Sequence, residues 1–355
     1  MEYKFMIVSN LYPSKDFPTY GVFVKNFCDQ LDELKVKYHL IYYKKRKNKL
    51  LKLMSYIKFY LEIVIKLLCY KYEIVYIHYP SHSCLPILLV SKMKKIKIYT
   101  NVHGSDVVPQ TTTQNKMLKY TKKIIKKSAR IIVPSLYFKK LIEQEYGVNS
   151  NKIFIYPSGG VNRDVFYPQD IECIPEKIYL GYIGRLAKGK GWDLYLKMLY
   201  QITQQEKYSN VKGIVCGNGE DSVRFWNMVK KLGVNDKIEY YEGLEQKKLN
   251  ELYNSMYCFC FPTMRKGESL GLVALEALAC GIPVISSNYA APKYYINELN
   301  GDKFEAGNLN DFIQCVEKML DLNSKEYVLK RQGAFLSSQE FDSKKLLYVL
   351  AEILK

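Results

Sequence analysis

The most specific chemical pattern in the sequence lies at residues 261–285, FPTMRKGESLGLVALEALACGIPVI. It predicts a buried strand, a polar loop to Glu268, and a helix that starts near Ser269 and ends near Cys280. The first turn of such a helix leaves backbone N–H groups unpaired at a positive dipole end, which suits a phosphate. Glu268 precedes the helix, Glu276 lies two turns into it, and carboxylates accept hydrogen bonds from sugar hydroxyls. A phosphate ligand that also carries hydroxyl groups therefore fits this segment.

A glycine-rich run, residues 182–193, joins another predicted strand to a helix and holds Arg185 and Lys190. Fixed cations at the end of a strand stabilise the charge that builds on a departing diphosphate. The run GxxxxGK within it is close to a Walker A loop, but Gly191 stands where that loop needs Ser or Thr to hold Mg²⁺. The run is more typical of a diphosphate site than of a P-loop NTPase, although a plain surface turn has the same composition.

Three weaker motifs also follow predicted strands. His103-Gly104 precedes a basic helix, Gly21 opens a helix after the first strand, and Gly217-x-Gly219 forms a tight turn. Each is a candidate ligand contact at a strand end, and each also fits an ordinary strand-to-helix turn.

The elements that must position these motifs alternate between β-rich and helical runs along the whole chain. Such alternation predicts parallel sheets covered on both faces, and two series of it predict two doubly wound Rossmann-like α/β domains that face a central cleft. We expect an N-terminal domain at 1–165, a C-terminal domain at 166–340, and a helix at 341–355 that packs back toward the N-terminal domain. Strands are predicted at 3–9, 38–43, 74–79, 96–102, 131–134, 153–156, 178–183, 213–216, 238–241, 258–262 and 283–286.

Charge is distributed unevenly between the two halves. The sequence has 53 Lys and Arg against 35 Asp and Glu, a net charge of +18, and residues 1–168 hold 29 basic and 11 acidic groups, which is the entire excess. Residues 44–71 combine a basic run at 44–49 with a predicted amphipathic helix at 50–70, and residues 116–130 are a second predicted basic helix. Lys58, Glu62 and Lys66 interrupt the apolar run of the first helix, which argues against a membrane span. These segments fit docking on an anionic membrane surface, solvated helix faces or nucleic-acid contact, and the apolar residues beside lysine favour lipid.

The cysteine pattern and missing motifs limit the chemistry further. The nine cysteines are scattered without a CxxC pair, so a structural zinc site is not expected and reduced thiols in a cytoplasm fit best. The sequence contains no Asp-x-Asp, GxSxG or HExxH, which leaves a metal-dependent sugar-nucleotide site of that kind, a nucleophile-elbow hydrolase and a zinc protease without support. The N-terminus, with Glu2 directly before a strand pattern, is not expected to be a signal peptide.

Taken together, the motifs resemble the retaining GT-B glycosyltransferases of the family-four group, in order and over nearly the whole chain. The most specific feature of this resemblance is Glu268-x7-Glu276; Ser269 stands where the family often has Gly. The resemblance implies that Glu276 holds the ribose hydroxyls, that Glu268 binds the donor sugar, and that Arg185 and Lys190 neutralise the diphosphate.

The same resemblance implies a catalytic set and a set of nucleotide-sugar contacts. The catalytic set is His103, Arg185, Lys190 and Glu268, with His103 near the anomeric centre. The nucleotide-sugar contacts are Gly21, Gly217, Gly219, Leu270, Gly271, Leu272 and Glu276. No metal is expected, and the nucleotide sugar is a co-substrate.

The implied activity is retaining transfer of a hexose-type unit from a nucleotide sugar, UDP-linked, to a hydroxyl of a lipid-linked or polysaccharide acceptor. Capsule or O-antigen synthesis at the cytoplasmic face of the cell membrane is the expected setting, with an anionic membrane surface and no nucleic acid as partner. The alternatives are a non-catalytic lipid- or nucleic-acid-binding protein of the same fold and a sugar-nucleotide epimerase, which would act with no acceptor added.

Overall fold

The computed structural model describes residues 5–17, 20–46, 48–172 and 177–355, and it divides the chain into two compact units. Unit 1 comprises residues 1–159 together with 346–355, and unit 2 comprises residues 160–345. The boundary between the units therefore lies six residues before the position that the sequence suggested. Cys173, one of the nine cysteines, lies outside the described residues.

Unit 1 contains a parallel sheet of six strands in the order β2-β1-β3-β4-β5-β6. The strands are β1 (Phe5–Ser9), β2 (Tyr38–Tyr42), β3 (Ile74–His78), β4 (Ile98–Asn101), β5 (Arg130–Val133) and β6 (Ile153–Ile155). The helices are α1 (Val22–Glu33), α2 (Lys49–Cys69), α3 (Pro80–Val90), α4 (Thr112–Lys127), α5 (Leu136–Tyr146) and most of α12 (Ser343–Leu354).

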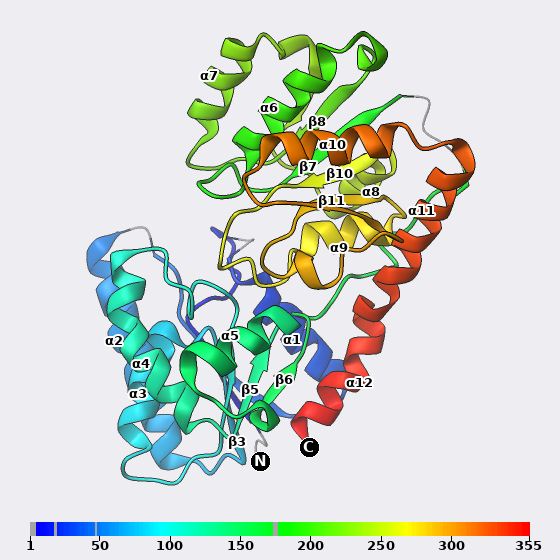
Figure 1. The fold of residues 1–355 in the computed structure, drawn as a ribbon. Coiled ribbons are helices and arrows are strands. Elements are labelled where there is room, and N and C mark those ends of the chain that lie inside the picture. The colour runs from blue at the N-terminus through cyan, green and yellow to red at the C-terminus, as the bar shows by residue number, and fades with distance from the viewer. Residues whose placement is uncertain (1–4, 18–19, 47, 173–176) are drawn as a thin grey trace. The chain divides into compact units, whose positions relative to one another are not determined.

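Helices cover both faces of this sheet, as the apolar composition of its strands requires. Successive residues of β1 point to opposite faces. Phe5 and Ile7 join a core with α1 and with Leu350 of α12, whereas Met6 and Val8 join a second core with α2 and α3. In Figure 1, α2, α3 and α4 lie side by side on one flank of unit 1, in agreement with the contacts of α3 with both neighbours.

Unit 2 repeats the scheme with a parallel sheet in the order β12-β11-β10-β7-β8-β9. Its strands are β7 (Tyr179–Ile183), β8 (Lys212–Cys216), β9 (Ile238–Tyr241), β10 (Cys258–Phe261), β11 (Val284–Ser287) and β12 (Gly301–Phe304). Its helices are α6 (Trp192–Thr203), α7 (Ser222–Leu232), α8 (Gln246–Asn254), α9 (Leu272–Ala279), α10 (Leu309–Leu320) and α11 (Ser324–Ser337). The prediction of two doubly wound Rossmann-like domains is confirmed.

The structure has one strand that the sequence did not predict, and it moves two predicted helix bounds. Strand β12 was missed because it is an edge strand whose sequence, GDKF, has only one apolar side chain. Helix α9 begins at Leu272 and not near Ser269, because Gly271 takes a left-handed conformation and forms the N-cap. The second basic segment was predicted as a helix to residue 130, but α4 ends at Lys127 and Arg130 begins β5.

Candidate active site

Ligands of parallel α/β sheets bind beyond the carboxyl ends of strands, where the strand order reverses. In unit 2 this switch point lies between β7 and β10, which pair in the sheet although β8 and β9 separate them in the chain. The loop after β7 carries Arg185 and Lys190, and the loop after β10 carries Glu268. The fold therefore places the two strongest sequence motifs at one end of adjacent strands.

Glycines bring these two loops into direct contact. Met264 donates its backbone N–H to the carbonyl of Gly189 at 2.8 Å. Gly191 has a φ of +77°, and a Cβ atom there would lie 1.9 Å from the carbonyl oxygen of Pro262. A side chain at residue 191 would separate the loops, so the residue that argued against a P-loop has a packing reason to be glycine.

The central feature of the site is an ion pair between the two loops. Lys190 Nζ donates to Glu268 Oε2 at 2.6 Å, and the side chains are only 18% and 12% exposed. Thr263 Oγ1 lies 3.4 Å from the same carboxylate oxygen. The sequence assigned Lys190 to a diphosphate and Glu268 to a sugar; the structure brings both groups together, so a cation and an acceptor for hydroxyls lie side by side.

The N-terminus of α9 follows directly after this pair. Gly271 has a φ of +80°, and a Cβ atom there would meet Tyr295 Oη at 2.8 Å. Tyr295 donates its hydroxyl to the carbonyl of Leu270 at 2.7 Å, which fixes the turn. Within the described part of the chain, the N–H groups of Gly271 and Leu272 have no hydrogen-bond acceptor. Such N–H groups at the positive end of a helix suit a phosphate oxygen.

Glu276 lies on α9, one face of which packs into the core. Tyr253 of α8 donates its hydroxyl to Glu276 Oε2 at 2.9 Å and to the carbonyl of Val273 at 3.0 Å. Burial raises the pKa of Glu276 to about 7, and the bond from Tyr253 opposes this rise. A carboxylate kept in such a costly environment is typical of a functional group.

The Gly217-x-Gly219 turn after β8 has a packing role that the sequence did not show. A Cβ atom at Gly217 would lie 2.0 Å from the carbonyl oxygen of Gly184, and one at Gly219 would lie 2.2 Å from that of Leu186. Leu186 in turn donates its N–H to the carbonyl of Asn218 at 3.2 Å. The two glycines thus hold the loop that carries Arg185, whose exposed side chain makes no hydrogen bond within the described ranges.

In unit 1 the structure brings the Gly21 and His103 motifs into one cluster. Gly21 is the N-cap of α1, and Phe23 in the first turn of that helix packs against His103 with ring centroids 4.2 Å apart. His78, the last residue of β3, lies with Nδ1 3.1 Å from His103 Nε2. Burial lowers the pKa of His103 to about 3 and that of His78 well below its usual value. Both imidazoles are therefore neutral at pH 7, which suits hydrogen bonding to a sugar rather than acid catalysis.

Asp106 holds the His103-Gly104 turn in place. Its carboxylate accepts the backbone N–H of His103 at 3.0 and 3.1 Å and that of Gly104 at 2.7 Å. Burial raises the pKa of Asp106 to about 6 in spite of these bonds. The turn therefore depends on a buried carboxylate.

Replacing Asp106 by alanine is expected to lower the free energy of unfolding by about 3 kcal/mol, because two buried N–H groups lose a charged acceptor. Urea unfolding at pH 7.5 measures this loss. Asp29→Ala is the matched control, since Asp29 is an exposed carboxylate paired with Lys25 on α1. Equal unfolding midpoints for the two variants would contradict the assigned role of Asp106.

Sequence reasoning missed three side chains of these sites: His78, Tyr253 and Tyr295. Each contributes a ring or hydroxyl from an element distant in the chain, so no local spacing could reveal it. Asp106 lies close by in the chain, but an Asp usually accepts N–H groups that follow it, whereas here it accepts two that precede it.

Within the part of the chain that the structure describes, no group of three or more His, Cys, Asp or Glu side chains could hold a metal ion. The eight described cysteines are free thiols, and all but Cys69 are buried.

Two family models match the chain, one for each unit. The model for glycosyl transferases group 1 matches residues 167–334, and the model for glycosyltransferase family 4 matches residues 21–159. Together they cover the motifs of both units.

Similar proteins point in the same direction. An uncharacterised 41.2 kDa protein in the cps region of Klebsiella pneumoniae is 25% identical over 72% of this chain and 72% of its own length. An uncharacterised glycosyltransferase of Methanocaldococcus jannaschii is 24% identical over 96% of this chain and 94% of its own. Among solved structures, Anabaena HepE in complex with UDP and glucose has a TM-score of 0.78 at 13% identity, over 99% of both chains.

Proposed function

Because the chain belongs to the family-four glycosyltransferases with the GT-B fold, we propose that it moves a hexose-type sugar from a UDP-linked donor to an acceptor hydroxyl. The acceptor is a lipid-linked or polysaccharide glycan of the cell surface, and the anomeric configuration is retained. The cps-region relative in Klebsiella supports a role in polysaccharide synthesis, and the UDP complex of the Anabaena structure supports the choice of nucleotide.

The observation that carries this proposal is the Lys190–Glu268 pair beside the free N–H groups of Gly271 and Leu272. A nucleotide sugar has a diphosphate for the lysine and the helix end, and sugar hydroxyls for the carboxylate. Arg185, whose side chain has no acceptor in the described structure, adds a second cation for the diphosphate. Glu276 accepts hydrogen bonds from the ribose, and the turn of Gly217 and Gly219, which packs on the loop of Arg185, borders the nucleotide.

In the proposed reaction the bond between the anomeric carbon and the phosphate oxygen breaks while a bond to the acceptor oxygen forms on the same face. The acceptor proton passes to the departing phosphate, so no protein nucleophile is required. Lys190, Arg185 and the N–H groups of α9 stabilise the charge on that phosphate, which is commonly the largest contribution to such catalysis. His103, neutral at pH 7, contacts the donor sugar as a hydrogen-bonding group, and Gly21 borders the diphosphate and acceptor.

We propose that the reaction needs no metal, since these cations supply the charge and the sequence has no Asp-x-Asp motif. We also propose that the enzyme works at the inner face of the cell membrane, on an anionic surface contacted through residues 44–71 and 116–130. None of the described helices combines the length and the apolar composition that a membrane-spanning helix requires.

A thermal-shift screen tests donor binding and metal use together. In EDTA, UDP or a UDP-sugar is expected to raise the melting temperature by several degrees, because a ligand at a hundredfold excess over its Kd adds about 2.7 kcal/mol. Mg²⁺ is expected to add nothing. The best donor is then followed by a hydrolysis assay in which UDP release is measured.

Two results would contradict the proposal. No shift with any nucleotide sugar would argue against a donor site, and a shift only with Mg²⁺ would argue against metal independence. Conversion of the donor into an epimer without acceptor would favour the epimerase alternative.

A further inference from the structure

Helix α2 has two apolar faces, and the fold covers only one of them. Phe59, Ile63 and Leu67 are at most 3% exposed and pack against the sheet of unit 1. On the opposite side an apolar stripe of six residues is between 48% and 58% exposed. These residues, called the α2 stripe below, are Leu53, Met54, Ile57, Leu61, Ile65 and Leu68.

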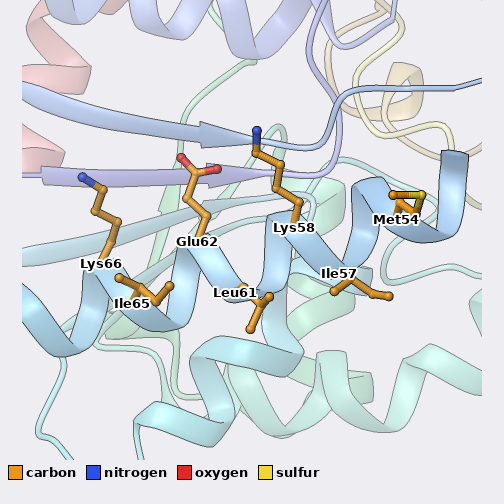
Figure 2. A pocket seen from close by; sticks show the side chains of 7 residues that line it. All are labelled: Met54, Ile57, Lys58, Leu61, Glu62, Ile65 and Lys66. Carbon is orange, nitrogen blue, oxygen red and sulfur yellow. The ribbon is translucent and has the colours of Figure 1, made fainter.

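Solvent-facing helices of soluble proteins normally carry polar residues on that side, so a continuous stripe of this kind marks a binding surface. Figure 2 shows Ile57, Leu61 and Ile65 on one side of α2 and Lys58, Glu62 and Lys66 on the other. The side chains of this stretch line a shallow groove along the helix. Lys94 donates to the carbonyls of Leu67 and Tyr70, each at 2.9 Å, so the end of α2 is fastened to the unit.

Positive charge borders the stripe from several directions. Lys44, Arg46 and Lys58 line a second groove between the end of β2 and α2. Helix α4 is separated from α2 by α3 (Figure 1). Its Ile124 and Ile125 are buried, whereas most of its lysines are exposed. The exposed lysines of α4 include Lys116, Lys119, Lys122, Lys123 and Lys126. Arg130 is not among these outward groups, because its guanidinium donates to carbonyls of α12.

This combination selects one partner. A second copy of the chain would place two strongly basic surfaces against each other, which opposes a symmetric contact. Nucleic acid offers phosphates for the lysines but no apolar phase for the stripe. An anionic lipid leaflet offers both, with phosphates at the surface and acyl chains beneath them.

We propose that the α2 stripe inserts among the acyl chains of an anionic leaflet, with α2 lying in the membrane plane and the lysines of α4 on the lipid headgroups. The docking is supported by the surface of unit 1. The purpose of docking, which is access to a lipid-linked acceptor, rests on the proposed function. Insertion of α2 and electrostatic contact of α4 are separate contributions, so they can be removed separately.

Flotation of the full chain with vesicles of phosphatidylglycerol and phosphatidylcholine tests the proposal. The wild-type protein is expected to float with anionic vesicles at low salt and not with pure phosphatidylcholine. The affinity of the triple variant Ile57→Gln/Leu61→Gln/Ile65→Gln for anionic vesicles is expected to be lower by about tenfold or more. Lys116→Gln/Lys123→Gln/Lys126→Gln is expected to lose about a hundredfold at low salt.

Matched controls lie in unit 2. Leu329→Gln/Leu336→Gln removes exposed leucines, and Lys230→Gln/Lys231→Gln/Lys247→Gln removes exposed lysines. Neither variant is expected to change vesicle binding. In a further variant, Leu61→Trp, the tryptophan emission is expected to shift to the blue with anionic vesicles, whereas Leu329→Trp is expected to show no shift.

The insertion of α2 would be overturned if the glutamine variant of the α2 stripe floats as well as the wild type, or if Leu61→Trp shows no blue shift. If the wild type does not float but forms a dimer, and the glutamine variant of the α2 stripe does not form that dimer, the stripe binds a second copy of the chain. Thermal shift with UDP on the same samples separates the two proposals. UDP binding without flotation would overturn only the docking, and flotation without UDP binding would overturn only the proposed function.

Discussion

Replacing Lys190 by alanine is expected to lower turnover by about two to three orders of magnitude while the protein remains folded. The reason is that a fixed cation beside a departing diphosphate stabilises charge that exists only in the transition state, and loss of one such donor typically costs this much. The ion pair with Glu268 holds the ammonium group in place before the donor binds. Initial rates of UDP release at saturating donor measure the effect.

The control is Lys188→Ala in the same loop. Lys188 is exposed, and in the described structure it forms no ion pair. Its variant therefore makes the same change in the same loop while the Lys190–Glu268 pair stays intact. Arg185→Ala is expected to lose turnover less strongly, because the exposed guanidinium is not held in position. If Lys190→Ala and Lys188→Ala turn over equally fast, the assignment of the diphosphate site is wrong.

Replacing Glu276 by glutamine is expected to weaken UDP binding at least tenfold and at the same time to stabilise the free protein at pH 8. Binding weakens because the ribose loses a charged acceptor. Stability rises because burial lifts the pKa of Glu276 from 4.5 to about 7. Between these values the folded state binds more protons than the unfolded state, so stability falls as pH rises; above pH 7 the cost is about 3 kcal/mol.

Calorimetry with UDP and thermal unfolding at pH 6 and pH 8 test both parts. In the wild type, UDP binding is expected to tighten as Glu276 ionises between these pH values, beyond the change due to UDP itself. Glu276→Gln reports the change due to UDP alone, and Glu251→Gln on the exposed side of α8 is the control for a lost charge. A glutamine variant that is less stable at pH 8 yet binds UDP normally would make Glu276 a structural residue.

The strands show how far local pattern extends into this fold. Runs such as Phe5–Ser9 and Tyr179–Ile183 are buried along their whole length and mostly apolar, because a parallel sheet buries both faces, so their composition identifies them. Gly301–Phe304 has no such run, because an edge strand has a neighbour on one side only and needs less apolar surface. It pairs with β11 through backbone groups, which any sequence supplies.

The candidate site divides in the same way. The glycines and charges after β7 and β10 are local signals, since a tight turn at a strand end requires particular residue types. The contact of Lys190 with Glu268 is not local, because it depends on the pairing of β7 with β10, which are neighbours in the sheet although β8 and β9 lie between them in the chain. The same holds for Tyr253 on Glu276 and for His78 beside His103.

By itself, then, the sequence determined the two α/β units, the chemical types at their strand ends and the excess of positive charge in the first half. Only the tertiary structure decided which groups meet, and which apolar face of α2 stays open. Periodicity reports that a helix has apolar sides, but burial depends on what packs against each side. Phe59 and Leu61 look equivalent in the sequence, yet one lies in the core at 2% exposure and the other faces solvent at 56%.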